Sequence, residues 1–403
     1  MPAHLRVPLV AGCAVAALLP VLILRSDGSA STAAEPLALA AAAEASPRTM
    51  SGVLVTRSRL GGRPTTSRSS FLLAAAGDQL VVNSPRQPLG EDTAYRAATA
   101  TEMRRIHPPA KTRAIISTGL GPAPPDLGPD DHVLRRSDAQ IVIALAAAGD
   151  PRVQPTTHAG RRAWRLRAGV PISKLAGPGG SPDHLEIVAD RETGLPLLAR
   201  ETLRGKLLLE RRVERLRFDV PAPASAFTLK LPRTPRPLRF DYGHRNVPLG
   251  RAAAVVGYAP LVPAALPDGY RRSRTTIARS AGRSGNEGGN PLSRNVVTTA
   301  YRRGFELVVV TTRCRRTRKP PCSKTGGFPR WSDPIGAGEG TVVDERPLAL
   351  SEGALADSRA RLVIDAQAVP HIWALTDNLV VTIAGPLSAN QLIAAAGSLQ
   401  PMR

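Results

Sequence analysis

Alternating apolar and polar positions dominate the chain after residue 48 and predict β-strands. The run from Met50 to Leu60 alternates in this way and stops at a Gly-Gly pair. The runs 67–76 and 79–83 flank Gly77-Asp78, as the two arms of a hairpin would. Four further strands are predicted over 158–170, 185–189, 195–203 and 206–219, and the last three are separated by short turns, which is typical of an antiparallel meander.

Side-chain alternation also predicts which way one of these strands faces. In the run from His158 to Val170, Trp164 and Leu166 fall on one face, and Arg165 and Arg167 fall on the other. We therefore expect one packed face and one charged face in this part of the sheet.

Helical spacing is confined to short segments. We predict helices over 36–45, 99–106, 137–148 and 389–397, the last with Ser388 as its N-cap. The density of proline, 38 residues in 403, excludes a long coiled coil or a helical repeat, because an internal proline breaks a helix.

A second group of strands follows residue 250. The predicted strands are 296–301, 305–312, 341–343, 361–365, 372–375 and 379–383. Residues 232–250 hold four prolines and four arginines with few apolar residues, and this composition predicts a linker. The expected organisation is thus one domain over 36–231, a linker over 232–250 and a smaller α+β domain over 251–403.

An uncharged stretch from Val7 to Leu24 follows Arg6 at the start of the chain. Residues 1–30 are expected to be either a cleaved secretory signal or an N-terminal membrane anchor, and both alternatives stay open. Arg6 favours an orientation with the N-terminus in the cytoplasm. In either case the bulk of the chain is expected outside the cytoplasm, at the cell membrane or secreted.

The net charge of +22 arises from 54 lysines and arginines against 32 acidic residues. Aromatic residues are only 3 % of the chain, which argues against stacking on single-stranded nucleic acid, and no nucleic-acid partner is expected. Anionic lipid head groups, wall polymers or an acidic protein face are the expected partners of this charge.

Two cysteines, Cys314 and Cys322, are expected to form a disulfide in an exported chain, with free thiols and a metal site as the alternatives. Basic residues crowd around them and form a candidate loop for an anionic partner, either a membrane surface or an acidic protein. The loop comprises Arg313, Arg315, Arg316, Arg318 and Lys319.

Catalytic motifs are absent from the sequence. It has no HExxH, no GxSxG and no Walker loop. Asp190 and Glu192 lie in a predicted turn, where solvated carboxylates are ordinary. We therefore predict a protein that is not an enzyme and that needs no cofactor and no metal.

The turn that begins at Asp190 carries a resemblance to a known group of proteins. The run HAGRRAWRL at 158–166 and the turn residues Asp190, Thr193, Gly194, Leu195 and Pro196 resemble the lipoprotein-carrier-like domain of the LolA, LppX and MucB/RseB families. The resemblance is closest to MucB/RseB-type sigma-factor regulators. It implies an α+β fold with a curved antiparallel sheet, a half-barrel, packed by helices and followed by a smaller α+β domain.

The same resemblance implies two functions. MucB/RseB-type proteins bind the extracytoplasmic part of an anti-sigma factor, so an exported regulator or envelope sensor is the leading hypothesis. The alternative is a lipid or lipoprotein carrier, whose groove would be lined by apolar alternating positions of the first strands. The candidate groove residues are Val53, Val55, Phe71, Leu73, Leu80 and Val82.

Overall fold

The computed structural model consists mostly of antiparallel β-sheet and contains few helices. It describes residues 48–59, 64–75, 78–83, 95–98, 102–106, 114–121, 152–169, 183–231, 236–278, 296–314, 342–365 and 369–402. The predicted helices 36–45 and 137–148 and the predicted signal or anchor lie outside these residues. Within them, no helix is long and apolar enough to cross a membrane.

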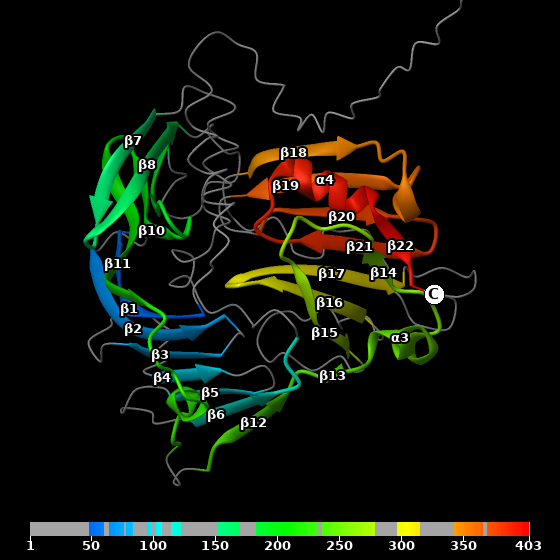
Figure 1. Cartoon of the computed structure of the whole chain (residues 1–403), viewed down its shortest axis with the longest axis horizontal. Helices are drawn as coiled ribbons and strands as arrows, with labels where there is room; N and C mark the ends of the chain where they lie inside the picture. The colour runs from blue at the N-terminus through cyan, green and yellow to red at the C-terminus, as the bar shows by residue number, and fades with distance from the viewer. Residues whose placement is uncertain are drawn as a thin grey trace, which may run out of the picture.

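A twelve-stranded open sheet forms the N-terminal part and curves around one side of the molecule (Figure 1). Its strand order is β12-β6-β5-β4-β3-β2-β1-β11-β10-β9-β8-β7, antiparallel throughout except for the parallel pair β12 and β6. The strands are β1 (Thr49–Ser58), β2 (Thr65–Ala74), β3 (Gln79–Asn83), β4 (Tyr95–Ala98), β5 (Glu102–Ile106), β6 (Ala114–Thr118), β7 (Arg152–His158), β8 (Arg161–Gly169), β9 (His184–Asp190), β10 (Pro196–Leu203), β11 (Lys206–Phe218) and β12 (Leu238–Asp241).

The predicted first strand, hairpin and meander are confirmed as β1, β2–β3 and β9–β11, and β8 lies within the predicted strand 158–170. The predicted helix over 99–106 is wrong, because residues 102–106 form β5 between β4 and β6. Pairing on both sides satisfies the backbone of this short segment, and such tertiary context overrides local helix propensity. Met103 of β5 and Leu120 form a small buried apolar cluster, against which Tyr242 packs.

A second open sheet of eight strands has the order β13-β15-β16-β17-β21-β20-β19-β18. Its strands are β13 (His244–Asn246), β15 (Arg271–Ala278), β16 (Val296–Arg303), β17 (Glu306–Cys314), β18 (Val342–Leu348), β19 (Arg359–Asp365), β20 (His371–Leu375) and β21 (Leu379–Ala384). A separate pair joins β14 (Leu261–Pro263) and β22 (Leu399–Pro401). The helical elements are η3 (Ala224–Phe227), α3 (Leu249–Val256), η5 (Gly353–Leu355) and α4 (Ala389–Gly397).

The terminal helix α4 begins as predicted. The Ser388 hydroxyl accepts a hydrogen bond from the Gln391 backbone N–H, and the Gln391 side chain accepts one from the Ser388 N–H. This reciprocal capping box satisfies two backbone donors that the first helical turn leaves without partners. Leu392, Ala395 and Ala396 on α4 are buried in the largest apolar cluster.

The segment predicted to be a linker instead contributes one strand to each sheet. Residues 238–241 form β12 beside β6, and residues 244–246 form β13 beside β15. Gly243 turns the chain between them with a φ of 79°, and its N–H donates to Asp241 at 2.8 Å. The prolines at 232, 235 and 237 precede β12, so they remove no donor from the strand.

The two sheets share an apolar core. Leu166 on β8 and Ile187 on β9 belong to the same cluster as Val308, Leu362 and Leu392 of the C-terminal part. A second contact involves Phe305, at the turn before β17, which packs against the cluster of Met50, Leu54, Phe71, Leu195 and Val213. Each sheet therefore buries apolar surface that it would expose alone.

Candidate functional site

The register of the meander separates the large sheet into two chemically different faces. Leu166 pairs with Ile187, which pairs with Ala199, and this face contributes to the core shared with the C-terminal part. The neighbouring position on each of these strands is charged: Arg167 pairs with Glu186, and Glu186 pairs with Arg200. Because successive side chains point to opposite faces, the charged face points away from the shared core.

A row of alternating charges crosses five strands of this face. In spatial order it contains Arg167 on β8, Glu186 on β9, Arg200 on β10, Glu210 on β11 and Arg57 on β1, each registered with the next. Residues directly opposite each other on one face are close enough to interact, and opposite charges there are favourable.

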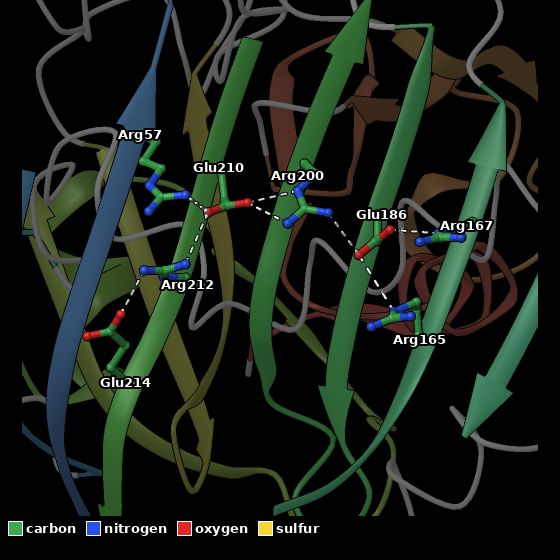
Figure 2. A network of polar contacts seen from close by, with 8 residues as sticks. All are labelled: Arg57, Arg165, Arg167, Glu186, Arg200, Glu210, Arg212 and Glu214. Atoms are coloured by element: carbon green, nitrogen blue, oxygen red, sulfur yellow. Dashed lines mark hydrogen bonds and ion pairs between the residues drawn. The ribbon is translucent and has the colours of Figure 1, made fainter. Parts of the chain in front are cut away.

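Further charged residues extend the row into a network, which we call the arginine–glutamate ladder. Figure 2 shows eight of its members on the strands that carry them. The ladder consists of Arg57, Arg68, Arg165, Arg167, Glu186, Arg200, Glu210, Arg212 and Glu214.

Arg200 is the centre of the ladder. Its Nη2 lies 2.6 Å and its Nε 2.8 Å from Glu210 Oε2, while its Nη1 lies 3.4 Å from Glu186 Oε1. All three guanidinium nitrogens therefore contact carboxylates. Outward from this centre, Arg167 Nε donates to Glu186 at 2.6 Å, and Arg212 Nη2 lies 2.9 Å from Glu214.

The carboxylates lie beneath the arginines. The Glu210 side chain is only 3 % exposed, and its Oε1 accepts no hydrogen bond although Arg57 and Arg212 lie 3.7 and 3.8 Å away. Val188 and Leu198, which share this face, are also buried. Long arginine side chains can cover apolar surface with their methylene groups while the guanidinium groups stay in water.

Contacts with arginine also determine the ionisation of Glu214, which pairs with Arg68 and Arg212. Partial burial would raise the pKa of Glu214, but the hydrogen bond and charge of Arg68, together with Arg212, outweigh it and hold the pKa below its usual range. Glu214 is therefore an anion at neutral pH.

The turn residues singled out in the sequence come together as a structural unit. Asp190 is 1 % exposed and accepts hydrogen bonds from the Thr193 N–H and hydroxyl, both at 2.9 Å, and from the Glu192 N–H at 3.1 Å. Arg161 forms an ion pair with the same carboxylate, and its hydrogen bond to Asp190 raises the pKa of the Arg161 guanidinium. Gly194 adopts a φ of 66°, and Leu195 and Pro196 then lead into β10.

Asp190 thus holds the corner between β9 and β10. Its hydrogen bonds within the turn account for the type and spacing of the turn residues. Within the described residues, no group of three His, Cys, Asp or Glu side chains is arranged to hold a metal ion.

The six candidate groove residues do not share one face. Val53 pairs with Ser70 and Leu80 pairs with Leu72, so Val53, Val55 and Leu80 lie on the charged side of the sheet, while the side chain of Val82 lies outside the described part of the structure. Phe71 pairs with Gly52 and lies with Leu73 on the opposite side, in the cluster that Phe305 contacts. The observed β1–β2 register, in which Gly52 rather than Val53 faces Phe71, separates the set.

The basic loop is only partly described. Cys314 is disulfide-bonded, but Cys322 lies outside the described residues, so their pairing stays a prediction. Arg315, Arg316, Arg318 and Lys319 also lie outside them. Arg313 is only 7 % exposed, because β17 continues to Cys314 and pairs Arg313 with Val380, so its placement on an exposed loop is wrong.

Glu201 on β10 is an acidic residue on the face opposite the ladder. It is registered with Leu185 and Leu209, and its carboxylate forms no hydrogen bond or ion pair with another described residue. Burial raises the pKa of its carboxyl, which the charge of Arg211 only partly offsets. As the pH rises, this carboxyl ionises first in the unfolded chain, so the folded state loses stability until the pH passes the folded-state pKa.

We therefore expect Glu201→Gln to stabilise the protein near pH 7 and to have little effect near pH 3, where the carboxyl is almost fully protonated in both states. Urea unfolding at both pH values measures this. Glu214→Gln is the matched control and is expected to lose stability near pH 7, because its pKa is lowered in the folded state. An equal gain in stability for Glu201→Gln at both pH values would contradict a raised pKa of Glu201 in the folded state.

Comparisons with known proteins find similar solved structures. No family model and no curated protein matches the chain. Among solved structures, MucB is similar at 17 % identity and a TM-score of 0.33, over 93 % of this chain and 99 % of that chain. The MucA/MucB complex from Pseudomonas aeruginosa is similar at 16 % identity and a TM-score of 0.28, over 93 % and 99 %.

A LolA superfamily protein from Nitrosomonas europaea is similar over 49 % of this chain and 97 % of that chain, at 10 % identity and a TM-score of 0.23.

Proposed function

We propose that this protein is a non-enzymatic extracytoplasmic regulator that binds the exposed part of a membrane protein, of the anti-sigma-factor type implied by the sequence resemblance. The main support is the packing of the apolar face of the large sheet against the C-terminal part. Leu166 and Ile187 share a core with Leu362, and Phe305 contacts the cluster that contains Phe71. Apolar surface buried in this way is not available to a lipid at those residues, which favours protein binding over lipid transport.

Affinity purification of the tagged full-length chain from native membranes, after cross-linking, tests the proposal. Mass spectrometry of the eluate would quantify bound protein and bound lipid against the tagged chain. We expect one membrane protein with an exported segment in near-equal molar amount, and no lipid enriched above an unrelated tagged exported protein. A lipid in near-equal molar amount, without a membrane protein, would establish the carrier alternative instead.

A further inference from the structure

The ladder carries more positive than negative charge. Six arginines face three glutamates, so three positive charges have no counterpart within the network. The glutamates are the less exposed members, with side chains 3 %, 12 % and 28 % exposed. An approaching molecule therefore meets guanidinium groups rather than carboxylates.

Four of the arginines have most of their donors available. Arg57, Arg68, Arg165 and Arg167, which we call the corner arginines, each donate at most one hydrogen bond to a ladder carboxylate, and their side chains are 36–52 % exposed. A guanidinium group has five N–H donors in a fixed plane. A glutamate that holds one nitrogen orients the rest of this plane, which suits two-point recognition of an external carboxylate.

We propose that the corner arginines dock an acidic polypeptide segment of the membrane partner. This inference rests on the proposed function and adds the surface and the chemistry of binding. Arg57 and Arg68 lie at one end of the ladder, on β1 and β2, and Arg165 and Arg167 lie at the other end, on β8.

The spacing of the two ends matches an extended chain. Four strand intervals separate β8 from β1, which is about 19 Å at about 4.8 Å per interval. An extended segment covers this distance in about six residues. Two acidic side chains about six residues apart in the partner therefore reach both pairs of corner arginines.

The alternation of charge distinguishes a polypeptide from a membrane surface. Lipid-binding basic surfaces are typically clusters of lysine and arginine. Here Glu186 and Glu210 lie between the two arginine pairs and neutralise Arg200 and Arg212, so the unbalanced positive charge is divided between the two ends of the ladder. Charge complementarity thus favours a segment with spaced carboxylates.

The test measures binding of a fluorescein-labelled peptide whose two glutamate pairs are about six residues apart, at about 50 mM salt. The ladder variant is Arg57→Gln, Arg68→Gln, Arg165→Gln and Arg167→Gln combined. The control variant removes the same charge from exposed positions elsewhere, namely Arg204→Gln, Arg251→Gln, Arg271→Gln and Arg359→Gln. We expect the ladder variant to weaken binding about tenfold or more, and the control variant to weaken it far less.

Equal weakening by both variants would overturn the inference, because it would reduce the effect to net charge. Binding to phosphatidylserine vesicles but not to the peptide, lost in the ladder variant, would overturn it in favour of a membrane surface. If the fourfold variant does not fold, the two end variants, Arg57→Gln with Arg68→Gln and Arg165→Gln with Arg167→Gln, are each expected to weaken binding, and unchanged binding in both would overturn the inference.

The failure of this inference is distinguishable from the failure of the proposed function. A ladder variant that still co-purifies with its membrane partner in undiminished amount overturns the docking surface and leaves the regulator function standing. Absence of any membrane partner from the unaltered protein overturns the proposed function, and the docking surface with it.

Discussion

Asp190→Ala is expected to lower the free energy of unfolding by roughly 3 kcal/mol, because it removes a buried acceptor that several donors share. The Thr193 N–H and hydroxyl and the Glu192 N–H would lose their acceptor, and Arg161 would lose its buried partner. Urea unfolding measures the loss.

Two variants at the same corner provide controls. Asp190→Asn keeps one acceptor oxygen and is expected to lose less stability than Asp190→Ala. Glu192 also pairs with Arg161, but its side chain is 65 % exposed, so Glu192→Ala is expected to cost under about 1 kcal/mol. An Asp190→Ala variant as stable as Glu192→Ala would show that the carboxylate does not hold the turn.

Ile187→Ala is expected to destabilise both sheets together, by roughly 2–5 kcal/mol. Ile187 is 3 % exposed and lies on β9, yet it belongs to the same cluster as Leu362 and Leu392. A cavity at this position removes contacts on both sides of the shared core. Native-state hydrogen exchange should therefore show lower protection in β20 and α4 as well as in β9.

Ile277→Ala provides the comparison for this shared core. Ile277 is completely buried in a separate cluster with Ala252, Val256 and Tyr258, all within the C-terminal part. Its replacement is expected to reduce protection first in α3 and β15. If Ile187→Ala lowered protection only in the large sheet, the two parts would be energetically independent, and the main support for the regulator proposal would be lost.

Part of the ladder was visible in the sequence, and part was not. The alternation around Trp164 already separated Arg165 and Arg167 from the packed face. Aligning the meander strands outward from their predicted turns could have brought Glu186, Arg200 and Glu210 into the same row. Arg57 could not be placed in this way, because β1 pairs with β11, about 150 residues further along the chain.

The sequence by itself determined the local features whose partners lie a few residues away. The capping box at Ser388, the turn at Asp190 and the hairpin at Gly77-Asp78 each depend on side chains and backbone groups within one turn of chain, so their residue types suffice to predict them. The strand segments of the meander follow for the same reason, since alternation is a local pattern.

Only the tertiary structure decided which strands are neighbours and which faces are joined. A register difference of one residue moves a side chain to the other face, and for this reason Val53 and Phe71 are separated although both alternate correctly. Residues 102–106 became a strand, and 238–241 an edge strand, because distant segments supplied backbone partners. The charged face became the outer one because the C-terminal part packs against the other face, a choice made by contacts between residues far apart in the chain.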